Sequence, residues 1–203
     1  MKTILGLFVA ALTLLPAGSA VAEPIRIVAF GGSSTYGAHE ARDRTYPYQL
    51  EQALRAKGHD VEVTNAGING NRTTDGLARM DAAIPDGTRI VLVEYGINDS
   101  FAKLPRSQTM ANIETMVTKL RARGIQVFVL GYRGSSGLDG LAAKYNAAFM
   151  PFGFPGNENP SYRIHNDPQQ QSQGVAHFNG AGYAKIVERL LPYVEALIAR
   201  VHP

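Results

Sequence analysis

Two adjacent serines, Ser33 and Ser34, directly follow an apolar run in the sequence. The run, Ile25–Phe30, predicts a buried strand, and the stretch FGGSSTYG at residues 30–37 then supplies glycines and hydroxyl groups at the end of that strand. A serine hydroxyl becomes a nucleophile when a general base takes its proton and nearby donors stabilise the oxyanion that forms. The alternatives are a phosphate-binding loop and a tight connection without chemistry.

The residue types around these serines narrow the choice. The stretch has neither the lysine of a phosphate-binding loop nor the G-x-G-x-x-G spacing of a dinucleotide loop, which argues against nucleotide binding. No serine of the chain stands in G-x-S-x-G, the nucleophile elbow of the α/β-hydrolases. The chain has no cysteine, so a thiol nucleophile, a thiolate metal site and disulfides are all excluded. A serine nucleophile here belongs to another type of hydrolase.

A general base must come from the five histidines. His39, His59 and His202 fall in predicted loops or at the end of the chain, which indicates exposed positions. His165 and His177 lie in an irregular region ahead of the last predicted helix. His177, in the stretch GVAHFNGAGY, directly precedes that helix and is the candidate base. The alternative is a structural histidine.

The elements that must position these residues alternate along the chain. Apolar runs and helical periodicity predict four strands and five helices, with the last helix broken or bent near Pro192 and residues 150–179 irregular. The predicted strands are Ile25–Phe30, Val61–Thr64, Arg89–Gly96 and Ile125–Gly131, and the predicted helices are Tyr46–Lys57, Thr73–Ala83, Ser107–Arg123, Leu138–Phe149 and Gly180–Val201.

This alternation predicts an α/β fold, a three-layer α/β/α sandwich of the flavodoxin-like kind with a parallel sheet of four to five strands. Ligands of such folds bind at the carboxyl ends of the strands. Three polar, glycine-bearing loops follow successive strands here, at residues 30–37, 64–71 and 96–100. They are expected to converge on one edge of the sheet.

The first 22 residues have the pattern of a secretory signal peptide. Lys2 precedes the apolar stretch Ile4–Leu15, and Ala20-Val21-Ala22 fits the small-x-small cleavage pattern. The apolar stretch is shorter than the ~20 residues of a membrane span. We expect an exported protein, periplasmic or secreted, with one domain over residues 23–203 and no stable membrane anchor after cleavage. The net charge is +3 with scattered basic residues, so nucleic-acid binding is not expected.

Four stretches together resemble the SGNH hydrolases, also called the GDSL esterase/lipase family. They are Gly31–Gly37 for the first block, Asn65–Gly70 for the second, Gly96–Asp99 for the G-x-N-D block and Gly174–Asn179 for the histidine block. The likeness covers nearly all of residues 25–203. Three further stretches resemble the bacterial thioesterase, lysophospholipase and arylesterase branch: Tyr46-Pro47, Gly76–Arg79 and Lys144–Asn146.

The resemblance implies roles for matching positions. Ser33 would be the nucleophile and His177 the base, and the oxyanion hole would consist of the Ser33 and Gly70 backbone N–H groups and the Asn98 side-chain amide. Ser34 is the rival nucleophile, but it stands where the family has leucine. Gly70 also fits a simple turn, and Asn98-Asp99 also fits a turn or helix cap.

Two aspartates of the family pattern are glycines in this sequence. Gly32 precedes the nucleophile, and Gly174 stands where the family has the carboxylate that orients the histidine. Three alternatives follow for His177. A backbone carbonyl near Gln173 could accept its N–H, Asp167 could reach it from the same loop, or the protein could be a weakened relative that only binds. The sequence by itself favours a plain Asp-Pro turn at Asp167.

The resemblance thus implies a serine hydrolase that cleaves carboxylic esters or thioesters through an acyl-serine intermediate. Acyl, aryl and lysophospholipid-type small molecules are the expected substrates, and no metal or cofactor is implied. A glycan O-deacetylase of the same fold is an alternative, as is a binding or scaffold relative without the triad aspartate. The segment at residues 151–173 looks shorter than the corresponding region of the family, where a fifth strand is expected.

Overall fold

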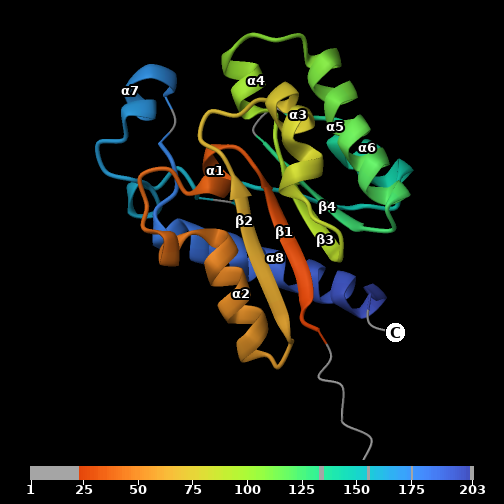
Figure 1. Ribbon diagram of the computed structural model, residues 1–203. Helices are drawn as coiled ribbons and strands as arrows, with labels where there is room; N and C mark the ends of the chain where they lie inside the picture. The colour runs from red at the N-terminus through yellow and green to blue at the C-terminus, as the bar shows by residue number, and fades with distance from the viewer. Residues whose placement is uncertain (1–22, 133–134, 155, 175, 202–203) are drawn as a thin grey trace, which may run out of the picture.

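The protein is described by a computed structural model, which covers residues 23–132, 135–154, 156–174 and 176–201. Its centre is a five-stranded parallel sheet with the order β2-β1-β3-β4-β5 (Figure 1). This confirms the predicted parallel α/β fold. The strands are β1 Ile25–Gly31, β2 Val61–Gly67, β3 Thr88–Glu94, β4 Gln126–Gly131 and β5 Ala148–Pro151.

Helices cover both faces of the sheet, which makes three layers. Helices α2 and α8 lie on one face, and α3, α5 and α6 lie on the other (Figure 1). The helices are α1 Ser33–Tyr36, α2 Tyr46–Ala56, α3 Thr73–Ala83, α4 Ile97–Phe101, α5 Arg106–Ala122, α6 Leu138–Lys144, α7 Pro168–Gln173 and α8 Gly180–Val201, with 3-10 turns at Arg42–Arg44 and Pro160–Tyr162. Among the described residues, none of these helices has both the length and the apolar character that a membrane crossing requires.

The inner strands explain the continuous apolar runs of the sequence. In β1, Ile27 and Ala29 pack into the core under α2 and α8, whereas Val28 and Phe30 pack into the core under α3 and α5. Side chains alternate between the faces of a strand, so a strand covered on both faces must be apolar at every position. The same alternation recurs in β3 and β4.

The structure corrects several predicted element boundaries. The predicted helix Leu138–Phe149 is wrong at its end, because α6 stops at Lys144 and Asn146 has a backbone φ of 51°, which a helix cannot contain. The apolar residues that follow form the edge strand β5, whose Ala148 pairs with Phe128 of β4. The region 150–179 also contains α7, and α8 continues through Pro192 without a break. Residues 1–22, where the signal peptide is predicted, lie outside the described part.

The layer of α2 provides a test of this packing. Leu50 of α2 is fully buried, whereas Tyr48 of the same helix is 46% exposed. Leu50→Ala should lower the free energy of unfolding by about 2–5 kcal/mol, because it leaves a cavity between α2 and the sheet. Tyr48→Ala is the matched control and should change it by about 0.5 kcal/mol or less. Urea denaturation measures both, and equal losses would contradict the assigned face of α2.

Candidate active site

Ser33 begins the short helix α1 at the carboxyl end of β1. It is buried, with 4% of its surface exposed, and Ser34 beside it is half-buried. Two contacts fix this turn. The Thr35 hydroxyl donates to Oε2 of Glu94 over 3.1 Å, and the Tyr183 hydroxyl of α8 donates to the Ser34 carbonyl over 2.9 Å. The backbone that carries Ser33 is therefore held by both β3 and α8.

A cavity of about 660 Å³ opens over this turn, and both Ser33 and His177 line it. Its wall is largely apolar and aromatic, with Ile97, Phe101, Tyr132, Phe152, Phe154 and Phe178 among the lining residues. The cavity brings together the predicted nucleophile and the predicted base, which are far apart in the sequence.

The His177 ring is oriented by a carboxylate. Its Nδ1 lies 2.7 Å from Oδ2 of Asp167, and the same oxygen accepts the His177 backbone N–H over 2.5 Å. Asp167 is completely buried at its side chain and His177 nearly so. The other ring nitrogen, Nε2, is buried without a hydrogen-bond partner in the described structure. An imidazole with Nδ1 on a carboxylate and Nε2 available is the arrangement of a general base.

The short helix α7 explains how Asp167 reaches this position. Asp167 is the N-cap of α7 and its Oδ1 accepts the Gln169 backbone N–H over 2.8 Å, as an Asp-Pro turn predicts. Gly174 ends the same helix with a φ of 72°, a conformation that an aspartate adopts only with strain. The residue at the family's aspartate position thus terminates α7, and the carboxylate comes from the beginning of that helix.

Burial and hydrogen bonding act in opposite directions on this pair. Burial alone would raise the pKa of the Asp167 carboxyl, but the backbone N–H groups of His177 and Gln169 and the imidazole hold that pKa below its ordinary value. Burial lowers the pKa of the His177 imidazole, and the Asp167 carboxylate opposes this shift. The pair therefore favours an ionised Asp167 beside a neutral imidazole, which is the form that can accept a proton.

Two of the donors predicted for the oxyanion, Gly70 and Asn98, lie after two strands of the sheet: Gly70 in the turn that follows β2, and Asn98 in the short helix α4 that follows β3. The Asn98 amide donates to the Asn71 carbonyl over 2.8 Å, and a Cβ placed on Gly32 would lie 3.0 Å from this amide nitrogen. Gly70 has a φ of 77°, which explains the glycine, and in the described residues no atom beyond its chain neighbours lies within 4 Å of the position that a Cβ would take. Asn98 is thus next to the residue before Ser33, although neither Gly70 nor Asn98 is among the residues that line the cavity.

Arg79 and Glu94 support these loops and were not predicted from the sequence. Nε of Arg79 donates to the Asn71 side chain over 2.8 Å, and its guanidinium also bonds to the Gly31 carbonyl and the Tyr95 hydroxyl. Glu94 is buried on the cavity wall, and burial raises its pKa to about 7. The sequence did contain a signal for Glu94, because a charged residue that directly follows a buried apolar run is unusual.

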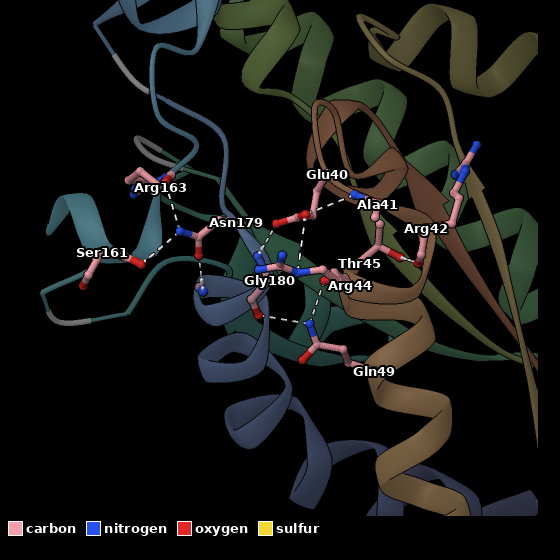
Figure 2. Close-up of polar contacts among 11 residues, drawn as sticks. Glu40, Ala41, Arg42, Arg44, Thr45, Gln49, Ser161, Arg163, Asn179 and Gly180 are labelled. Carbon is pink, nitrogen blue, oxygen red and sulfur yellow. Dashed lines mark hydrogen bonds and ion pairs between the residues drawn. The ribbon is translucent and has the colours of Figure 1, made fainter.

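The segment that carries His177 is fastened to the loop after α1. Asn179 donates to the carbonyls of Ser161 and Arg163 over 2.9 and 3.0 Å (Figure 2). The next residue, Gly180, donates its backbone N–H to Glu40 over 2.5 Å, and its carbonyl accepts from Gln49 of α2. These contacts set the distance between the loops that carry the serine and the histidine.

The chain belongs to the GDSL-like lipase/acylhydrolase family, whose model matches residues 29–185. An arylesterase of Vibrio mimicus is 30% identical over 120 residues, 59% of this chain and 59% of that protein. Esterase TesA of Pseudomonas aeruginosa is 35% identical over 83 residues, 40% of this chain and 41% of that protein. The aligned parts therefore span less than two thirds of either relative.

Solved structures confirm the fold over a longer range. AlinE4, described as an SGNH-hydrolase family esterase, has a TM-score of 0.65 and 28% identity, and the match covers 91% of this chain and 100% of AlinE4. A crystal structure of TesA has a TM-score of 0.71 at 23% identity and covers 85% of this chain and 99% of that one. This chain therefore shares the overall fold of both structures.

The contact between His177 and Asp167 predicts a measurable titration. In Asp167→Asn the pKa of His177 should fall further below its ordinary value, because the carboxylate charge that opposes the effect of burial is lost. The His177 ring signals in an NMR pH titration measure this directly. Glu195→Gln, which removes a carboxylate from His59 instead, is the control and should leave the His177 titration unchanged. An unchanged pKa in Asp167→Asn would contradict the contact.

Proposed function

We propose that the chain is an ester hydrolase that acts through Ser33, His177 and Asp167. The observation that carries this proposal is the buried carboxylate–imidazole pair, whose unpartnered Nε2 belongs to a residue lining the same cavity as Ser33. Membership of the lipase/acylhydrolase family supports it. The pair also argues against a weakened, non-catalytic relative, because the carboxylate missing at Gly174 is supplied by Asp167.

The chemistry follows from the contacts of each group. His177 Nε2 takes the proton of the Ser33 hydroxyl as its oxygen attacks the ester carbonyl, and Asp167 keeps Nδ1 protonated and steadies the imidazolium. The backbone N–H groups of Ser33 and Gly70 and the Asn98 amide donate to the oxyanion, each worth ~3 kcal/mol. His177 then protonates the leaving group. Water, activated by the same imidazole, hydrolyses the acyl-serine and restores Ser33.

The cavity wall supports acyl or aryl groups as the part of the substrate that is bound. Its six apolar and aromatic side chains named above offer area for dispersion contacts with such groups. We therefore favour acyl or aryl esters, thioesters and lysophospholipid-type molecules over an acetylated glycan. The related arylesterase and the Escherichia coli protein named thioesterase 1/protease 1/lysophospholipase L1 are consistent with this range.

We also propose that the protein works outside the cytoplasm as one domain, residues 23–203, after cleavage of residues 1–22. The signal-peptide pattern of the N-terminus supports export. The absence of cysteine suits either the periplasm or the exterior, because the core then holds the fold without disulfides.

A fluorophosphonate probe tests the choice of nucleophile. The mature chain and Ser34→Ala should become labelled, whereas Ser33→Ala should not, because only Ser33 is expected to have both a base and oxyanion donors. Intact-protein mass spectrometry measures the adduct. Labelling that survives Ser33→Ala and disappears in Ser34→Ala would show that Ser34 is the nucleophile and would contradict the choice of Ser33.

Hydrolysis of p-nitrophenyl acetate tests the role of Asp167 as the third residue of the proposed Ser–His–Asp triad. Asp167→Asn should lower kcat by about 10⁴, the loss seen when the carboxylate of a serine protease triad is neutralised. Asp86→Asn changes a fully exposed carboxylate and should leave kcat unaltered. An unaltered kcat in Asp167→Asn would instead support a Ser–His dyad with a backbone carbonyl.

A further inference from the structure

A second histidine stands beside the Asp167–His177 pair. Nε2 of His39 lies 3.9 Å from Oδ1 of Asp167, and its ring centroid is 5.6 Å from that of His177. One ligand atom from each of these three residues lies within 4.8 Å of the others. His39 is 44% exposed at its side chain, so the cluster is open to solvent on the His39 side and buried on the other.

The loop that carries His39 is held firmly. His39 has a φ of 64°, and its neighbour Glu40 accepts the Gly180 N–H at the beginning of α8 (Figure 2). The Gly37 N–H donates to the Ser33 carbonyl at the other end of the same loop. His39 is thus presented to Asp167 by a backbone that is fixed at both ends, and its side chain alone has to adjust.

Two imidazoles and one carboxylate are a ligand set that zinc favours. Nitrogen and carboxylate ligands sit about 2.0–2.2 Å from zinc, so two of them on one ion are at most about 4.2 Å apart. The 3.9 Å between His39 and Asp167 meets this limit, and the wider spacing within the cluster closes with a small movement of the exposed His39 ring.

We propose that His39, Asp167 and His177 form a site for Zn²⁺ at which the ion inhibits the reaction and does not serve as a cofactor. Zinc would bind Nδ1 of His177, the ring nitrogen that faces Asp167. The proton of the neutral imidazole would then sit on Nε2, so Nε2 could no longer accept the Ser33 proton and the general base would be lost. Arg163 is a cation near His177 and weakens the site, whereas the Asp167 carboxylate strengthens it. The loss of activity rests on the proposed function, but zinc binding does not.

The test separates binding from inhibition. Calorimetry with ZnCl₂ on the mature chain at neutral pH measures binding, and hydrolysis of p-nitrophenyl acetate with and without zinc, followed by EDTA, measures inhibition. His39→Asn removes the imidazole and tolerates the positive φ. His59→Asn removes an imidazole that contacts Glu195 and belongs to no part of this cluster, so it is the matched control.

The mature chain and His59→Asn should bind one zinc ion per chain and lose hydrolysis reversibly. His39→Asn should bind zinc about tenfold or more weakly and resist inhibition, with unaltered hydrolysis in the absence of zinc. Equal zinc affinity in His39→Asn, or no binding to the mature chain, would overturn the site. Binding that depends on His39 but leaves hydrolysis intact would overturn the inhibitory role. A metal-free chain that binds zinc through His39 yet hydrolyses no ester supports the site and contradicts the proposed function alone.

Discussion

The buried hydrogen bond between Asp167 and His177 is the interaction on which the site depends. A carboxylate is costly to bury without donors, and here the backbone N–H groups of Gln169 and His177 join the imidazole in satisfying it. The charge then fixes the ring so that Nε2 remains available. Without this contact the imidazole would have neither a set tautomer nor a stabilised cation, and Ser33 would lack an effective base.

The rest of the fold brings His177 of this pair and Ser33 to the wall of one cavity. The parallel sheet brings the ends of β1, β2 and β3 to one edge, so that the loops carrying Ser33, Gly70 and Asn98 are neighbours. The histidine comes from the opposite end of the sequence, and the contact between Glu40 and Gly180 links its loop to the loop after α1. The proposed catalytic geometry therefore depends on tertiary contacts between segments about 140 residues apart.

The strands and loops that depend on neighbouring residues alone were predicted from the sequence. The apolar runs of β1, β3 and β4 indicated strands covered on both faces, and the glycine-bearing loops indicated the functional edge. A fifth strand was expected only further along the chain, and the residues that form β5 were assigned in part to a helix, because they continue the apolar pattern of α6 and only pairing with β4 distinguishes the two. From the sequence, the contact between Asp167 and His177 was one of several open alternatives. It could not be chosen among them because it depends on α7, which brings the two residues together and whose ends are set by Asp167 and Gly174. His39 looked like an exposed loop residue, and nothing local reveals its neighbour.

A crystal structure of the mature chain after reaction with an ethyl phosphonate ester would test the account most directly. We expect phosphorus bonded to the Ser33 oxygen, a phosphonyl oxygen within hydrogen-bond distance of the Gly70 N–H and the Asn98 amide, and the contact between His177 and Asp167 intact. An adduct on another residue, or a His177 ring bonded to a backbone carbonyl in place of Asp167, would contradict it.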